Sequence, residues 1–548
     1  MDCPGGPHLT LSPRDRQPSF FDVSFLAENR FDGDDPYSLF RQEVLPALEA
    51  QRGGLGARYC ADNGRPALDP VLVAGVTLRQ FMEKAPDRQA LERVRFHLGW
   101  KHALGLPVDD AGFHPTSLVY FRQRLLEHPK TRCVFAAILQ GLEGKGLVPR
   151  RGKQRLDSTH ILGLVAHLSR LEKTRETIRL FLEMLERRQR LGEVPEGQVL
   201  RERYLDSEVP YHKLSKEALA EKFRQAGSDM QALLEWIKPQ KDLVLQEKTK
   251  LLQRVFAEQF EITPAGPSMR PQEASGTVQN PHDPDAPWAA KDQKKTKVWV
   301  GYKAQIAETV GPEDTGAKPK GEPTSQFLTE VTTPEAMASD LDGRERLEQQ
   351  QEEEEHGLGR AEVEYVDAAY STDDTLAQAS QEGRRLLGPA RPSGNPSGKL
   401  FPTEAFDVSM AQRRALCPAG PPSTQCRRLE NEATGQVDYR FAWSYHGDDC
   451  PLQSPCTQAG SGRRAVVVSQ YHDYRQDRRH ARQTEAFPQQ RRQRNGIEGT
   501  ISAFTRNGGR RTRYRGLAKT ALANYVHGQP STPNAGFVCG STGWARTR

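Results

Sequence analysis

Apolar residues recur at helical spacing through the first part of the chain. Between residues 87 and 104 they return every three or four positions, with charged residues between them. These positions are Leu91, Val94, Leu98 and Leu104. We predict that residues 26–145 form a compact bundle of short helices. Such a bundle is compatible with DNA binding, although packing of a core explains the periodicity equally well.

A second helical block follows Asp157. One face of the expected helices is apolar and the other is charged, and the pattern recurs weakly up to about residue 260. We predict an antiparallel helical insertion over about residues 165–262. Its clearest apolar face consists of Leu168, Leu171, Ile178, Leu182 and Leu185.

The period changes from helical spacing to two near residue 296. The chain alternates between two sets of residues, as expected for the two faces of a β-strand. One set is Val298, Val300, Tyr302, Ala304 and Ile306, and the other is Trp299, Gly301, Lys303 and Gln305. A turn rich in Gly and Pro separates this strand from a second short run, "SQFLTEVTT". The two runs together predict a β-hairpin.

A helix is predicted directly after the hairpin. Thr333 is a suitable N-cap and Pro334 a suitable first helical residue. The helix would run out through the acidic "RERLEQQQEEEEHG". We interpret this acidic run as a solvated helix face or loop.

Two strands and one more helix complete this region. "AEVEYVDAAY" is typical of a buried strand, and "RRLLGPARP" of another. Between them, Ser371 and Asp374 are spaced for a capping box, and Gly383 stands where a short helix would end. The order hairpin, helix, strand, helix, strand predicts a mixed α/β sheet.

The C-terminal part combines an irregular region with an amphipathic helix. Residues 391–465 are rich in Pro, Gly and Ser, and we predict an inserted loop region there. Beyond it, Ile497, Ile501 and Phe504 recur at helical spacing, which predicts a helix that packs on the sheet. Glu498 lies at the edge of that stripe.

Composition indicates a polar protein, 548 residues long, with 36% hydrophobic residues and a mean hydropathy of −0.72. No run approaches the roughly 20 apolar residues of a membrane span, and the N-terminus lacks the apolar centre of a signal peptide. We therefore expect a cytoplasmic protein without membrane contact.

The charge is unevenly distributed. From residue 461 onward the chain has 17 Lys or Arg against four Asp or Glu, a balance of +13, so a net charge of +6 leaves −7 for the first 460 residues. Arginine pairs with phosphate through two parallel hydrogen bonds, so the basic segment favours a nucleic-acid partner over a merely solvated surface.

Half of the eight cysteines lie close together in the sequence. Cys417, Cys426, Cys450 and Cys456 fall within 40 residues of one another. In a chain without a secretion signal, such a group favours a metal site over disulfides.

Three carboxylates stand where a sheet and its covering helix could bring them together. Asp157 follows a short predicted strand, Asp367 lies on the strand after the hairpin and helix, and Glu498 lies on the last helix. Converging carboxylates suit Mg²⁺, and a pair of such ions serves phosphoryl transfer. With 71 acidic residues in the chain, however, chance triples are abundant.

Four segments together resemble the DDE transposases of bacterial insertion sequences that have an InsH-like N-terminal domain. These segments are "LDSTHILGLVAHLSRLEKTRETIR", "NPHDPDAPWAAKDQKKTKVWVGYKAQIAET", "VEYVDAAY" and "RNGIEGTISAFTRNGGRRTRYRGLAKT". The resemblance covers roughly residues 20 to 526. It implies an α/β fold with an RNase H-like mixed-sheet core, a helical insertion and a preceding all-helical domain. It also implies that Asp157, Asp367 and Glu498 bind Mg²⁺ or Mn²⁺ as a catalytic triad.

The resemblance divides the chain into parts and suggests which residues contact DNA. The parts are a tail (1–25), a helical DNA-binding domain (26–145), the core (146–400) with its insertion, a Cys-containing insertion (401–465), the last part of the core (466–527) and an irregular tail (528–548). Arg494 matches the Arg that precedes the family's Glu by four. Arg510, Arg511, Arg513 and Arg515 are further expected DNA contacts, and Lys519 is either another or a solvated residue.

The cysteines resemble a Cys-containing insertion seen in this family. Where a further Cys would complete a C-x₂-C, this chain has Gly447, so Cys426 or His446 would have to act as the fourth ligand of a structural Zn²⁺. The last residues, "HGQPSTPNAGFVCGSTGWARTR", depart from the family's apolar helix and are typical of a frame change or a decayed copy.

The expected function is metal-dependent cleavage of DNA at the ends of an insertion sequence, followed by strand transfer into target DNA. The expected partners are the terminal inverted repeats, the target DNA and a second copy of the chain, in the bacterial cytoplasm at the nucleoid. Two alternatives remain. One is a nuclease of the same fold without strand transfer, and the other is a truncated, inactive transposase that only binds DNA.

Overall fold

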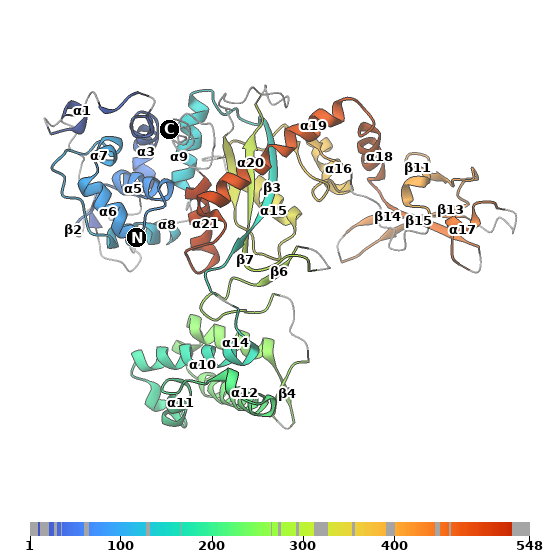
Figure 1. Ribbon diagram of the computed structural model, residues 1–548. Coiled ribbons are helices and arrows are strands. Elements are labelled where there is room, and N and C mark those ends of the chain that lie inside the picture. Colours follow the sequence, from blue (N-terminus) through green and yellow to red (C-terminus); the bar gives the residue numbers. More distant parts are fainter. Residues whose placement is uncertain are drawn as a thin grey trace.

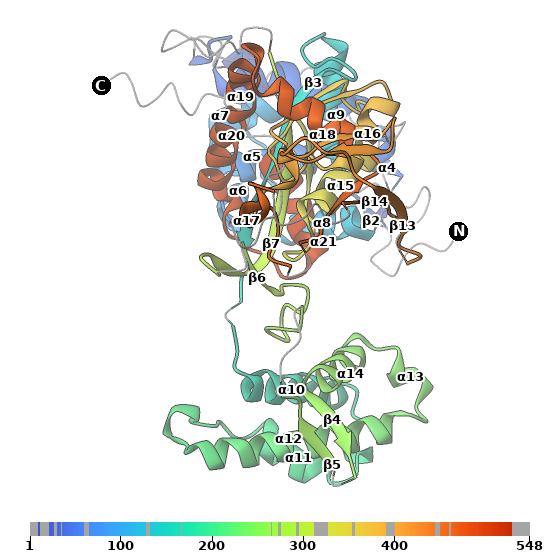
Figure 2. The ribbon, with the colours of Figure 1, turned by 90° about the vertical axis from the view of Figure 1, so that its right-hand side faces the viewer.

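The computed structural model describes most of the chain. The described residues are 9–10, 21–26, 30–33, 35–57, 59, 65–127, 132–165, 167–264, 266–271, 276–291, 295–311, 327–352, 357–390, 400–433, 435–443, 450–459 and 462–528. Helices from the N-terminal part, a central sheet and a small β-rich lobe follow one another across the view of Figure 1. A helical lobe projects away from the sheet and stays apart from it after a 90° turn (Figure 2).

The N-terminal part is helical. Its central helix α5 (Pro70–Met82) begins with Pro70 after Asp69, whose carboxylate accepts a hydrogen bond from the Val71 amide. The surrounding helices are α2 (Pro36–Leu39), α3 (Leu45–Ala50), α4 (Arg52–Gly56), α6 (Asp87–Phe96), α7 (Leu98–Leu104), α8 (Thr116–Glu127) and α9 (Cys133–Gly144). The predicted helical character is confirmed.

The periodic segment of residues 87–104 is two helices rather than one. The chain leaves the helical conformation at His97, and the His97 ring accepts a hydrogen bond from the Trp100 amide to begin α7. Leu91, Val94 and Leu104 are buried as the spacing predicts, but Leu98 is 39% exposed because the break turns it away from the core.

The central sheet has the strand order β8-β7-β3-β9-β10, with β6 (Trp288–Ala290) paired to the first part of β7. β7 pairs antiparallel with both β3 and β8, whereas β3, β9 and β10 run parallel. These strands are β3 (Lys153–Leu162), β7 (Val298–Thr309), β8 (Leu328–Thr332), β9 (Val363–Tyr365) and β10 (Arg385–Leu387). This order and these directions make the core RNase H-like, and the predicted hairpin of β7 and β8 is confirmed.

Helices cover both faces of the sheet. On one face α15 (Asp340–Glu352) and α16 (Asp373–Gln381) pack on Leu156 and Ala307. On the other face lie α20 (Ile497–Phe504) and α21 (Leu517–Gly528), in one hydrophobic core with the N-terminal helices. Ile497 and Phe504 are fully buried and Ile501 packs against them, so the predicted apolar stripe is confirmed.

The predicted start of α15 is wrong by several residues. Thr333 is not its N-cap; its hydroxyl accepts a hydrogen bond from the Asn524 side chain instead. Glu335 forms a bridge with Tyr302 of β7, and a turn in which the Ala338 amide donates to the Glu335 carbonyl then leads to the true start. There Ser339 and Asp342 exchange hydrogen bonds, each side chain with the other's backbone amide, as a capping pair.

The capping box of α16 is also shifted, by one residue. Thr372 and Thr375 form it, whereas the predicted Ser371 is fully buried with its hydroxyl facing the Asp367 carbonyl. Gly383 follows the helix end with φ +68°, as the sequence predicts.

The segment after β3 forms the separate helical lobe with its own core. Ser169 and Glu172 form a capping box at the start of its first helix, and Ile178, Leu182 and Leu185 are fully buried. Its helices are α10 (Arg170–Arg187), α11 (Gly197–Tyr204), α12 (Lys216–Ile237), α13 (Lys241–Val244) and α14 (Glu247–Gln259), and the hairpin β4 (Phe260–Thr263) and β5 (Gly266–Met269) follows them.

The region predicted as loops is instead a small β lobe with its own core. It contains β11 (Asp407–Ser409), β12 (Arg414–Leu416), β13 (Gln425–Glu430), β14 (Val437–Trp443) and β15 (Arg464–Ser469). In β14, every second side chain from Val437 to Trp443 is buried. This period of two outweighs the Pro and Gly content that suggested loops.

None of the described helices is both long and apolar enough to cross a membrane.

Candidate active site

The register of the parallel strands β3 and β9 brings two aspartates together. Arg155 pairs with Tyr365, and Asp157 and Asp367 each follow two residues later, at the same edge of the sheet. Neighbouring strands lie about 4.8 Å apart, so the two carboxylates are neighbours. In agreement with this, the negative charge of Asp367 contributes to a raised pKa at Asp157.

Asp157 faces the helices that carry the third acid. It lies opposite Ile306 of β7, and Ile306 packs in the same core as Ile497 of α20. Its carboxylate accepts hydrogen bonds from the Ser158 amide at 2.7 Å and from Arg494 at 2.5 Å. Burial raises the pKa of Asp157 to about 6, against the lowering effect of Arg494.

Glu498 is the second residue of α20 and is 68% exposed. Arg494, at the end of α19 (Ala486–Asn495), donates to Glu498 at 3.2 Å with one guanidinium nitrogen and to Asp157 with the other. One guanidinium therefore links two of the predicted acids. The Asp367 carboxylate accepts from the Ala369 amide at 2.7 Å, which fixes the turn after β9.

A cavity of about 500 Å³ opens at this edge of the sheet. Asp367 and Glu498 both line it, and so does Arg494. Its remaining wall comes from the end of β10 and from α18 (His472–Ala481) and α19, which Figure 1 shows beside α16. Two basic residues of this wall, Arg478 and Arg482, were not predicted from the sequence.

The structure holds no ready-made metal site at this point. In the residues that it describes, no group of three or more His, Cys, Asp or Glu side chains is arranged to hold a metal ion. The donor chemistry nevertheless fits a hard divalent cation, because the mostly buried Asp157 carboxylate, with the negative charges of Asp367 and Asp340 nearby, would be stabilised by added positive charge.

Asp340 and Arg155 are two charged residues near this edge that the sequence analysis missed. Asp340 accepts a hydrogen bond from the Ser158 hydroxyl at 3.0 Å and lies on the α15 side of the sheet, and its charge adds to the raised pKa of Asp157. Arg155 is completely buried and bonds to Glu308 of β7 and to the Gln493 carbonyl of α19.

The predicted arginines after Glu498 lie at the other end of β3. Arg510 donates to the His160 carbonyl at 2.8 Å, Arg511 forms a bridge with Leu162, and Arg515 approaches the His282 ring at 3.4 Å. Leu162 lies five positions beyond Asp157 on β3, a distance of about 16 Å. Arg510 reaches closer, because it also donates to the Thr159 hydroxyl at 3.3 Å, two residues from Asp157.

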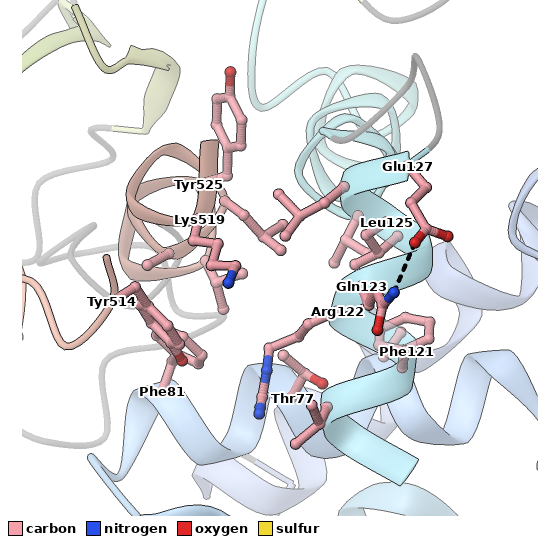
Figure 3. Close-up of a pocket in the computed structure, with 17 residues that line it drawn as sticks. Thr77, Phe81, Phe121, Arg122, Gln123, Leu125, Glu127, Tyr514, Lys519 and Tyr525 are labelled. Carbon is pink, nitrogen blue, oxygen red and sulfur yellow. Dashed lines mark hydrogen bonds between the residues drawn. The ribbon is translucent and has the colours of Figure 1, made fainter. Parts of the chain in front are cut away.

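Arg513 is exposed, and Lys519 borders a second cavity of about 560 Å³ between α8 and α21. That cavity is mostly apolar, and Figure 3 shows Lys519 beside Tyr514 and across from Arg122. Lys519 is therefore remote from the cavity that Asp367 and Glu498 line.

Of the four cysteines that are clustered in the sequence, three lie near one another in the structure and Cys426 lies apart. The thiols of Cys417 and Cys450 lie close enough to Cys456 to add to its raised pKa, whose main cause is burial. Cys426 lies exposed on β13; partial burial of its thiol raises its pKa against the lowering effect of Arg413. His446 and Gly447 lie outside the described residues.

Comparison with known families gives two matches. Residues 416–526 match a family model described as a transposase DDE domain, and residues 26–124 match one described as a transposase domain. Neither a curated protein nor a solved structure matches the chain. The first match includes Glu498 and strands β13 to β15 of the β lobe, whereas Asp157 and Asp367 lie before it. The second match covers most of the N-terminal helices.

Proposed function

The chain belongs to the DDE transposases of insertion sequences, and on this premise we propose that it cuts DNA at the ends of its element and joins the freed ends to target DNA. The register of β3 and β9 carries the proposal, because it sets Asp157 and Asp367 side by side below the helix of Glu498. In the first step water attacks a phosphodiester and releases a 3′-hydroxyl. In the second step that hydroxyl attacks a phosphodiester of the target, with no covalent protein intermediate.

Asp157, Asp367 and Glu498 would together hold Mg²⁺ or Mn²⁺. Carboxylate oxygens are the ligands that these cations prefer. When bound, such ions supply activation of the attacking oxygen and stabilisation of the leaving oxygen.

Other side chains would position this centre. Arg494 holds Asp157 and Glu498 toward each other through its two ion pairs. Arg155 anchors the end of α19, three residues before Gly496 and α20, because it donates to the Gln493 carbonyl at 2.6 Å. Together they fix the helix that carries Glu498 against the strand that carries Asp157.

DNA would be held on two sides of the centre. Arg494, together with Arg510, Arg511, Arg513 and Arg515 at the other end of β3, would contact backbone phosphates. The N-terminal helices would bind the terminal inverted repeats, and two copies of the chain would act together on the DNA of the bacterial nucleoid. Lys519 lies beside the apolar cavity, so we favour its role as a solvated residue over a contact with DNA.

The β lobe would hold a structural Zn²⁺. Thiolates are preferred zinc ligands, and Cys417 and Cys450 both influence the Cys456 thiol. The three thiols are not arranged as a metal site in the described residues, so zinc binding would have to draw them together. Cys426 is exposed on β13 and is not among the groups that influence Cys456, which supports leaving it out of this proposed site.

The test is cleavage and joining of a DNA fragment that carries the repeats flanking the gene, in Mg²⁺ or Mn²⁺. Cleavage and joining that disappear in Asp157→Asn and in Glu498→Gln would support a working transposase. Cleavage without joined products would instead indicate a nuclease of the same fold. Binding without cleavage by any of the proteins would indicate an inactive transposase.

A further inference from the structure

Arg478 of α18 is the residue from which we draw a further inference. Three arginines of this helix are anchored in the structure, but in different ways. Arg475 pairs with Asp373, and Arg479 pairs with Glu404. Within the described part of the chain, Arg478 has no carboxylate partner.

Two neutral acceptors hold the Arg478 guanidinium in place. Its Nε donates to the Gly388 carbonyl at 3.1 Å, and one terminal nitrogen donates to the Gln490 side chain at 3.2 Å. The second terminal nitrogen has no partner among the described residues. Burial lowers the pKa of Arg478, which still leaves a guanidinium charged at neutral pH. A fixed positive charge therefore stands without compensation.

This charge faces the cavity of the carboxylates. Arg478 lines the same 500 Å³ cavity as Asp367 and Glu498, and the exposed Arg482 and Arg491 line it as well. The positive charge of Arg494 is already shared between Asp157 and Glu498. Arg478 is thus the half-buried cation of this cavity that is available to an incoming anion.

The wall that carries Arg478 is built tightly against the strand of Asp367. Gly388, whose carbonyl anchors Arg478, approaches Val366 so closely that a Cβ at this position would stand 2.7 Å from the Val366 carbonyl oxygen. The Val366 amide also donates to the Leu387 carbonyl at 3.0 Å. Arg478 is therefore fixed relative to Asp367 through a short and rigid path.

We propose that Arg478 binds a backbone phosphate of the DNA strand that enters this cavity, next to the phosphate that is cleaved. An arginine fork matches the oxygens of a phosphodiester, and its preset position lowers the cost of ordering the side chain. This proposal rests on the proposed function, because DNA is the ligand. It assigns to Arg478 a contact that the motifs near Glu498 do not include.

The test is the salt dependence of DNA binding, measured without divalent metal on a duplex taken from one end of the DNA that flanks the gene. Loss of one phosphate contact lowers the slope of log K against log salt by about 0.9. We expect this decrease in Arg478→Gln. Arg478→Lys keeps the charge and should keep most of the slope. Arg492→Gln is the matched control, because Arg492 is exposed on α19 and does not line the cavity.

An Arg478→Gln protein with the slope of the wild type would overturn the proposal, and so would an equal decrease in Arg492→Gln. Absence of any DNA binding by the wild type would overturn it too. Circular dichroism of each variant excludes misfolding as the cause of a decrease. Since the assay requires no cleavage, a wild type that binds with the expected slope pattern but never cuts would refute the proposed function alone.

Discussion

Replacement of Gly496 by alanine should destabilise the protein although it adds a better helix former. Gly496 joins α19 to α20 with helical angles, φ −57° and ψ −28°, so its backbone does not require glycine. The space of its missing Cβ is taken by the guanidinium of Arg155, which an alanine side chain would overlap. Arg155 and its partner Glu308 are both completely buried, and Thr500 of α20 also donates to Glu308.

The size of the effect follows from this buried network. To admit the methyl group, either the guanidinium leaves Glu308 and the Gln493 carbonyl, or α20 moves away from β3. Breaking a buried ion pair from one side costs about 3–5 kcal/mol. A displaced α20 would also misplace Glu498, two residues further on, and a shift of about 1 Å can lower a catalytic rate on the order of 100-fold.

The matched control is Gly499→Ala in the same helix. No atom lies within 4 Å of the position that a Cβ of Gly499 would occupy. Alanine there should stabilise the helix by about 0.5–1 kcal/mol. Urea unfolding followed by circular dichroism should therefore shift the two midpoints in opposite directions, and DNA cleavage should fall in Gly496→Ala. Equal stability of the two variants would refute the reasoning.

Three further predictions concern other parts of the chain. Burial lowers the pKa of His472 to about 4, so its contribution to the free energy of unfolding is fully present above about pH 6.5 and decreases by on the order of 3 kcal/mol toward pH 4. The variant His472→Gln should therefore show a flatter pH dependence of urea unfolding. An unchanged pH dependence would contradict this. Cys450→Ser should remove bound zinc from the purified protein by elemental analysis, whereas Cys426→Ser should retain it; loss in both would contradict the grouping. Ser339→Ala should lower the thermal midpoint through loss of about 1 kcal/mol at the start of α15, and an unaffected midpoint would refute its role as the cap.

The sequence predicted those elements whose pattern is set by one dominant face. α20 is an example, because burial on the sheet selects its apolar positions. The strand β7 was also predicted, from its period of two, although both of its faces are buried. Helix starts were less predictable. Thr333 and Ser339 are both good N-caps, and the choice between them depends on the bridge between Glu335 and Tyr302, which no local pattern reveals.

The candidate site likewise contains residues that were predictable from the sequence and residues that were not. The three acids were predicted from motifs, and the neighbourhood of Asp157 and Asp367 follows from strand register. The roles of Arg155 and Arg478 were not predictable, because each depends on a carbonyl of a residue far away in the sequence, Gln493 in one case and Gly388 in the other.

The central claim is that Asp157, Asp367 and Glu498 form one metal-binding centre. Its most direct measurement replaces Mg²⁺ by Fe²⁺ and generates hydroxyl radicals at the bound iron, which cut the polypeptide chain nearby. The account predicts chain cuts near residues 157, 367 and 498 together, suppressed by excess Mg²⁺ and absent in Asp157→Asn. Cuts near only one of these residues, or the same cuts in Asp157→Asn, would contradict a shared centre.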